Sequence, residues 1–217
     1  MMKQRLLVPE LLDSMDAADP RAIRSRLDLR FINAFLGNER WIRSKLREHS
    51  EKIHSLLELG AGDGHLLRRL HGMLPKAIIA GLDLRARPEE LPSGIHWIRG
   101  NFLETLTDGK ADACIGNLIL HHFDSEALRT LGGKLQEFRL LLFSEPLRKT
   151  LPMRLARMVL PLAGEVTRHD MPASIRAGFI KGELPSLLGL DPAHWNVKEY
   201  ESGRGSLRLM AIRKPTS

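Results

Sequence analysis

A glycine-rich loop that joins an apolar run to a helical segment constrains the fold of this chain more than any other feature. The apolar run at residues 56–59 is followed by Gly60, Gly62 and Gly64, and a helix-like segment begins at His65. Glycine has no Cβ, so a ligand can lie directly against its backbone, and the N-terminus of the following helix presents free N–H groups. The loop therefore predicts a nucleotide-type cofactor at the end of a buried strand.

The spacing of this loop bears on which cofactor it holds. Glu58 precedes the glycines, which gives the pattern E-x-G-x-G-x-G. Dinucleotide-binding loops instead carry the pattern G-x-G-x-x-G. A dinucleotide is therefore the remote second choice, and the loop needs support from the rest of the chain.

Short apolar runs alternate with helical segments from residue 53 onward. This alternation is typical of repeated strand–helix units and a parallel sheet. We predict strands near residues 53–59, 77–83, 95–99, 111–117 and 138–144, and helices near 63–73 and 125–132. The glycine loop then lies at the carboxyl edge of the sheet, where ligands bind in such folds.

Other elements flank this core on both sides. Asp19-Pro20 predicts a helix start, and apolar residues then recur at helical spacing. After residue 146 we expect helices near 151–160, 174–178 and 183–188, and strands at 194–200 and 206–213. The prediction is one domain over residues 1–217, with an N-terminal helical segment (1–50), a cofactor-binding core (51–145), a helical cap (146–190) and a terminal hairpin (191–217).

Charge and composition limit the partners. The net charge of +7 raises nucleic acid as a possibility, but the arginines before residue 50 alternate with acidic residues, which favours a solvated helix face. The single cysteine, Cys114, cannot form an internal disulfide, and no run approaches the ~20 apolar residues of a membrane span. We expect a cytoplasmic protein without a membrane span. A nucleic-acid partner is disfavoured but stays open, as does the oligomeric state.

Polar residues also follow the next three predicted strands. Asp83 ends the second strand, where its carboxylate can accept both hydroxyls of a ribose. Asn101 and Phe102 follow the third strand, and Asn117 ends the fourth. Together with the glycine loop, this series resembles the class I S-adenosylmethionine-dependent methyltransferases. Asn101 stands where that family usually has aspartate, and its amide keeps an oxygen acceptor for an adenine amine.

The resemblance implies a fold and a cofactor. The fold is an α/β, Rossmann-like, doubly wound seven-stranded sheet, mostly parallel with a C-terminal antiparallel hairpin, plus N-terminal helices and a helical cap. The implied cofactor is S-adenosyl-L-methionine. The residues implied to bind it are Glu58, Gly60, Ala61, Gly62, Gly64, Asp83, Leu84, Asn101, Phe102 and Asn117.

The segment after the fourth strand, Leu120-His121-His122, resembles a motif of small-molecule methyltransferases. Where the acceptor is a hydroxyl, the enzyme must take its proton, and histidine suits that task near neutral pH. His122 is our first choice of base and His121 the alternative, although either ring could instead pack beneath the cofactor. We expect no metal here, because adjacent side chains point apart and no ligand-type spacing accompanies the pair.

The predicted cap contains Thr167-Arg168-His169-Asp170 and further residues of a pattern that resembles bacterial methyltransferases of polyketide or other aromatic-product pathways. We expect His169 to be a second base candidate and an acceptor contact, while Asp170 caps a helix that starts at residue 171. Arg148 is expected to hold a phenolate or carboxylate, and Phe179 to line the pocket. A paired arginine and an ordinary core phenylalanine are the structural alternatives.

The resulting functional prediction is methyl transfer to a small, aromatic, hydroxylated metabolite, with oxygen as the preferred acceptor. Carbon methylation of a quinone precursor stays open within the same fold. A nucleic-acid base methyltransferase is disfavoured, because residues 117–120 read Asn-Leu-Ile-Leu where such enzymes carry N/D-P-P-Y/F. A protein that only binds S-adenosylmethionine would keep the glycine loop but lack an open acceptor cavity.

Overall fold

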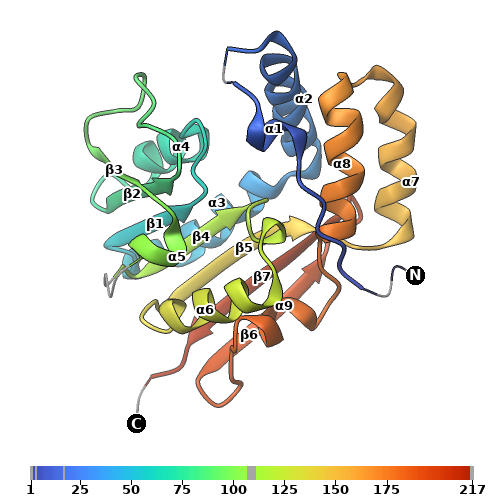
Figure 1. Cartoon of the computed structure of the whole chain (residues 1–217). Coiled ribbons are helices and arrows are strands. Elements are labelled where there is room, and N and C mark those ends of the chain that lie inside the picture. The colour runs from blue at the N-terminus through green and yellow to red at the C-terminus, as the bar shows by residue number, and fades with distance from the viewer. Residues whose placement is uncertain (1, 3, 17, 107–110, 216–217) are drawn as a thin grey trace.

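A single seven-stranded sheet organises the described part of the chain, residues 2, 4–16, 18–106 and 111–215 of this computed structural model (Figure 1). The strand order is β3-β2-β1-β4-β5-β7-β6. Strands β1 to β5 run parallel, and β7 pairs antiparallel with both β5 and β6. The strands are β1 (Ser55–Leu59), β2 (Ile78–Asp83), β3 (Ile95–Arg99), β4 (Ala113–Asn117), β5 (Leu140–Pro146), β6 (Trp195–Glu201) and β7 (Ser206–Arg213).

Helices cover both faces of the sheet because buried strand residues alternate between two apolar clusters. Cys114 belongs to the cluster that includes residues of α5, α6 and α9, whereas Ile115 belongs to the cluster of α3 and α4. The helices are α1 (Leu11–Ser14), α2 (Pro20–Leu36), α3 (Asn38–Glu48), α4 (His65–Met73), α5 (Phe102–Thr105), α6 (Ser125–Leu135), α7 (Thr150–Val159), α8 (Glu165–Ala177) and α9 (Glu183–Leu187).

This architecture confirms the predicted fold class. The doubly wound sheet, the C-terminal antiparallel hairpin, the N-terminal helices and the helices after β5 are all present. The observed strands start and end within two residues of the predicted ones. The division into four segments stays a prediction, and residues 216–217 of its last segment lie outside the described residues.

Helix α8 differs most from expectation. From the sequence we expected a short helix near residues 174–178 and Asp170 as the N-cap of a helix that starts at residue 171. The structure instead has 13 residues of helix with Pro172 inside it. Proline in a helix interior costs about 3 kcal/mol, and packing offsets that cost because Val166, Ala173 and other residues of α8 are buried against the N-terminal elements. Asp170 is thereby an interior residue of the helix.

Helix α2 begins where predicted, with Asp19 accepting a hydrogen bond from the backbone N–H of Arg21. Its apolar stripe is exposed, however: Ile23, Leu27 and Phe31 all keep substantial surface, whereas the buried positions of the helix are the small residues Ala22 and Ser25. Small residues let α2 approach α8 closely, and the Ser25 and Thr167 hydroxyls are bonded across that contact. In the described residues, no helix has the length and apolarity needed to cross a bilayer.

Helix α6 packs against the residue that follows α9, and substitutions at its two adjacent glycines test that contact. A Cβ on Gly132 would lie 2.3 Å from the carbonyl oxygen of Leu188, whereas one on Gly133 meets nothing within 4 Å. We expect Gly132→Ala to destabilise the fold by about 1–3 kcal/mol through overpacking. Gly133→Ala should stabilise it by up to about 1 kcal/mol through helix propensity. Urea unfolding midpoints measure both, and equal shifts for the two variants would contradict the expected packing.

Candidate functional site

The glycine loop lies at the carboxyl end of β1 and leads into α4. Gly60, Gly62 and Gly64 all have positive φ, at 65°, 58° and 70°, a region that suits glycine. A Cβ on Gly60 would lie 2.6 Å from the side chain of Ile119, whereas the space beside Gly62 is open. The loop therefore packs on the segment after β4 at one glycine and offers an open backbone at the next. Ala61, between them, is buried.

Asp83 joins β2 to this loop. One carboxylate oxygen accepts the N–H of Gly62 at 2.7 Å, and the other accepts the N–H of Arg85 at 2.9 Å. Each carboxylate oxygen has two lone pairs, so acceptor capacity remains on both. Leu84 follows with 70% of its surface exposed, which leaves an apolar surface beside the carboxylate. Asp83 thus keeps acceptor capacity beside the glycine loop, and its binding of a ribose stays a prediction.

Two buried side-chain oxygens near the loop have no hydrogen-bond partner. They are Oε2 of Glu58, on β1, and Oδ1 of Asn117, at the end of β4. Burial raises the pKa of Glu58 well above its usual range, and the nearby carboxylates of Glu39, Asp63 and Asp83 add to that effect. A buried polar group without a partner is destabilising unless something binds it. The residue after Asn117, Leu118, has a φ of 57°, which is uncommon outside glycine and typical of functional sites.

The predicted adenine contacts lie at the start of α5. The Asn101 side-chain oxygen accepts the N–H of Leu103 at 3.0 Å, so this residue caps the helix. Phe102 is buried, and its ring lies 4.6 Å from that of Phe123. The structure therefore gives both residues local packing or capping contacts, and their binding of adenine stays a prediction.

Glu145, near the end of β5, organises the segment that follows β4. Its buried carboxylate accepts the backbone N–H groups of Ile119, Leu120 and His121 at 3.1, 2.9 and 3.2 Å. It also lies 2.8 Å from Nδ1 of His121. One carboxylate thus fixes both the backbone and a ring of the predicted histidine pair.

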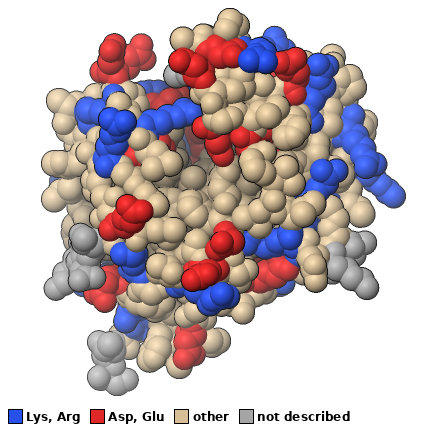
Figure 2. All heavy atoms as spheres, viewed as in Figure 1, with Lys and Arg blue, Asp and Glu red and all other residues tan. Residues whose placement is uncertain are grey.

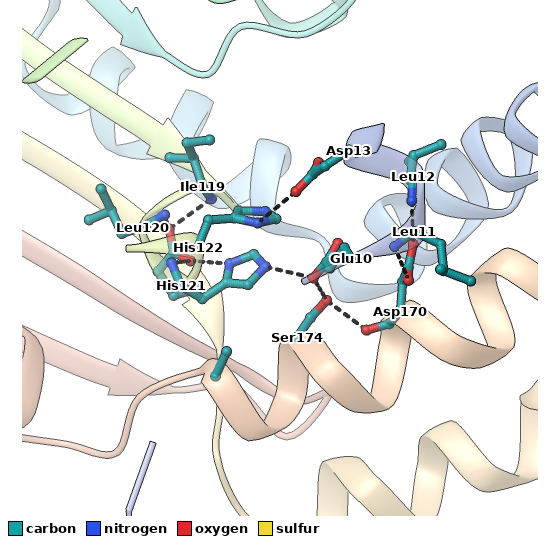
Figure 3. A network of polar contacts seen from close by, with 12 residues as sticks. Glu10, Leu11, Leu12, Asp13, Ile119, Leu120, His121, His122, Asp170 and Ser174 are labelled. Atoms are coloured by element: carbon teal, nitrogen blue, oxygen red, sulfur yellow. Dashed lines mark hydrogen bonds and ion pairs between the residues drawn. The ribbon is translucent and has the colours of Figure 1, made fainter. Parts of the chain in front are cut away.

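His121 lies between two carboxylates. Glu145 contacts its Nδ1, and Glu10, from the N-terminal segment, lies 3.5 Å from its Nε2 (Figure 3). Burial lowers the pKa of this histidine, but the contacts with Glu10 and Glu145 outweigh burial and raise it to about 9. His121 is therefore a cation at neutral pH in this arrangement, which does not fit the role of a general base predicted as the alternative to His122.

His122 keeps an accessible ring. Its side chain is 25% exposed, and its Nδ1 lies 3.4 Å from a carboxylate oxygen of Asp13. This contact holds the pKa of Asp13 below its usual range against the opposing effect of burial. The sequence analysis expected the two histidines to point apart, but their ring centroids lie 4.2 Å apart. The short 3-10 helix Leu120–His122 permits this, because Glu145 holds its backbone N–H groups in a tight turn.

His169 and Asp170 form a hydrogen-bonded pair despite being neighbours in α8. His169 Nδ1 lies 2.8 Å from the Asp170 carboxylate, whereas the sequence analysis expected adjacent side chains to diverge. Asp170 also accepts the N–H groups of Leu11 and Leu12 at 2.8 and 3.1 Å, so it attaches α1 to α8. These contacts give the pair a structural role, and a catalytic role for His169 stays a prediction.

Arg148 and Phe179, the predicted acceptor contacts, are both fully buried. Arg148 donates to Glu183 and to the carbonyl oxygen of Gly178, which leaves it a paired arginine rather than an open anion contact. The ring of Phe179 belongs to the main core, and the guanidinium of Arg5 lies 4.2 Å from its centroid. Both residues therefore support the wall of the site, and direct contact with an acceptor stays a prediction.

The N-terminal segment supplies groups that the sequence analysis missed. Arg5 donates to the backbone oxygens of Ala177, His121 and Phe123, and Glu10 and Asp13 contact the histidine pair. In Figure 1 this segment runs across α8 toward the carboxyl edge of the sheet. Figure 2 shows the same face hollowed at its centre, with acidic and basic atoms interspersed around it. No motif marks residues 5–13, so only the fold could reveal their position.

Glu58 permits a pH test of the site. The pKa of Glu58 is higher in the folded state than in the unfolded chain. As the pH rises above the unfolded-state pKa, the unfolded chain loses this proton first, so the free energy of unfolding falls. We expect Glu58→Gln to raise the melting temperature of the ligand-free protein at pH 7.5, by about 2–4 °C per kcal/mol gained, and less at pH 5. Glu89→Gln, at an exposed position, is the control. An equal effect of Glu58→Gln at both pH values would contradict the buried, protonated state.

Solved structures of other proteins share the fold of this chain. No family model matches the sequence, and no curated protein does. Among solved structures, the plantazolicin methyltransferase BpumL in complex with a monoazolic desmethylPZN analog and SAH has a TM-score of 0.71 at 14% identity, over 91% of this chain and 92% of that one. Human N-acetylserotonin methyltransferase in complex with SAM has a TM-score of 0.61 at 14% identity, over 94% of this chain and 61% of that one.

A putative O-methyltransferase from Nostoc punctiforme has a TM-score of 0.63 at 14% identity, over 94% of this chain and 64% of that one. At such identities the likeness establishes the fold. The chain therefore has the Rossmann-like fold of the S-adenosylmethionine-dependent methyltransferases, which confirms in its architecture the resemblance found in its sequence.

Proposed function

We propose that this chain is a methyltransferase that transfers a methyl group from S-adenosyl-L-methionine to a hydroxyl of a small, aromatic metabolite. One observation carries the proposal: the open backbone at Gly62, the carboxylate of Asp83 and the unpartnered oxygens of Glu58 and Asn117 meet at one edge of the sheet. Buried oxygens without partners are expected where a ligand supplies the missing donors. The fold supports the same cofactor, since similar structures were solved in complex with SAH or SAM.

The chain's own residues would hold the cofactor in three places. Asp83 accepts the ribose hydroxyls, and Leu84 offers an apolar surface to the adenine. Gly60, Ala61, Gly62 and Gly64 bring the backbone close, while Glu58 and Asn117 offer their free oxygens. Asn101 and Phe102 complete the adenine side. When bound, S-adenosylmethionine supplies a methyl group on a sulfonium, which is poised for displacement without a covalent enzyme intermediate.

Proton removal from the acceptor falls to His122 in this proposal. It has an accessible ring, whereas His121 is buried and cationic between Glu10 and Glu145. Asp13, beside His122 Nδ1, would stabilise the charge that His122 gains when it takes a proton. A hydroxyl acceptor needs such a base, so this geometry favours oxygen over carbon methylation. The interspersed charges of Figure 2 and the absence of N/D-P-P-Y/F at residues 117–120 disfavour a nucleic acid.

Calorimetric titration with S-adenosylhomocysteine tests the cofactor. We expect Asp83→Ala to weaken binding by ten- to a hundredfold or more, because hydrogen bonds to charged groups contribute about 1.5–3 kcal/mol each. Asp83→Asn should show a smaller loss, since it keeps one oxygen acceptor. Both variants also lose or weaken the contact of residue 83 with the Gly62 N–H, so their unfolding temperatures are measured to separate a loss of stability from a loss of binding. Unchanged affinity in Asp83→Ala would remove the ribose role, and binding of NAD instead would overturn the cofactor.

Turnover with a panel of phenols tests the base. We expect His122→Ala to lower kcat by about 10²–10⁴-fold, the usual contribution of general-base catalysis, while S-adenosylhomocysteine still binds. His169→Ala should have a smaller effect, because its ring is bonded to Asp170. A larger loss in His169→Ala would assign the base to that residue instead. Full turnover in both variants would exclude histidine as the base.

A further inference from the structure

The cluster of Glu10, His121 and His122 joins residues far apart in the sequence, and each offers an atom that binds transition metals. One ligand atom from each residue lies within 4.8 Å of the others. We propose that this cluster binds a divalent transition-metal ion of the zinc type. The sequence analysis expected no metal, because it placed the two rings apart and could not place Glu10 beside them.

The spacing of these atoms fits a metal site. Glu10 Oε1 and His121 Nε2 lie 3.5 Å apart. Hydrogen-bonded nitrogen and oxygen atoms usually lie 2.7–3.2 Å apart. In a tetrahedral zinc site with bonds of roughly 2.0–2.1 Å, neighbouring ligand atoms are about 3.4 Å apart. The Glu10–His121 separation is therefore longer than a usual hydrogen bond and close to the edge length of a zinc tetrahedron, and the ligand atom of His122 lies within 4.8 Å of both.

The surrounding contacts orient the ligand atoms. Glu145 lies 2.8 Å from Nδ1 of His121, which directs Nε2 toward Glu10 (Figure 3). A carboxylate behind a metal-binding histidine is the usual outer partner of such sites. The hydroxyl of Ser174 donates to Glu10 and restricts that carboxylate. Asp13 lies 3.4 Å from Nδ1 of His122 and would orient that ring in the same way as Glu145 orients His121.

Charge and ligand type limit which metal ions the cluster can bind. Glu10, Asp13 and Glu145 bring carboxylates to the cluster, whereas Arg5 is a nearby cation. Two imidazoles with a carboxylate suit zinc, iron, cobalt or nickel, while magnesium and calcium prefer oxygen ligands alone. Three protein ligands would leave a position open for another oxygen. If the proposed function holds, an acceptor hydroxyl there would lose its proton more readily, and the metal would take over the task assigned to His122.

Direct metal binding tests the inference without any turnover. The full chain is treated with chelator, dialysed, and titrated with Co²⁺ by visible absorption and with Zn²⁺ by calorimetry, without cofactor or acceptor. We expect one ion per chain with tetrahedral Co²⁺ bands. Glu10→Gln and His122→Ala should each weaken affinity at least tenfold, while His96→Ala, at an exposed histidine outside the cluster, leaves it unchanged.

Melting temperatures of the two ligand variants establish that they fold, so the buried His121 need not be changed. Failure to bind one ion, or equal affinity in Glu10→Gln, His122→Ala and His96→Ala, would overturn the metal site. The Glu10–His121 contact would then be an ion pair alone. S-adenosylhomocysteine binding is measured in a separate titration. Absence of metal binding would therefore not contradict the proposed methyl transfer, and absence of cofactor binding would not contradict the metal site.

Discussion

The buried carboxylate of Glu145 is the interaction on which the rest of the site depends. Three backbone N–H groups and a histidine ring converge on it, from the segment that follows β4. A carboxylate without these donors would be very costly to bury at the end of a strand. The tight turn after β4 and the close approach of the two histidine rings therefore depend on one group on the adjacent strand β5.

The N-terminal segment is attached to the same place by a second set of polar contacts. Arg5 binds backbone oxygens beyond the histidines, and Asp170 binds the N–H groups of α1. The contact of α1 with Asp170 depends on the helical course of α8 through Pro172. A break there would separate Asp170 and Ser174, which lie one turn apart and hold α1 and Glu10 respectively. This part of the site is thus held together by contacts between the N-terminal segment and α8.

The sequence predicts the fold well because its signals are local. Alternating apolar runs identify the strands, and the glycines and Asp83 identify the edge of the sheet where a cofactor belongs. It fails where distant residues meet. No motif marks Glu10, and only the fold places it and Glu145 on the two sides of His121. It also misjudges neighbours: the paired His169 and Asp170 and the exposed apolar stripe of α2 depend on packing against other elements.

The attachment of the N-terminal segment has a consequence for the order in which the protein assembles during synthesis. Arg5 contacts Ala177 across 172 positions of sequence, and Leu11 contacts Asp170 across 159. The ribosome releases these partners long after the segment itself has emerged. Loop closure over such distances is slow and opposed by chain entropy. The nascent segment therefore cannot make these contacts until α8 has been synthesised and has formed, and the site is completed only then.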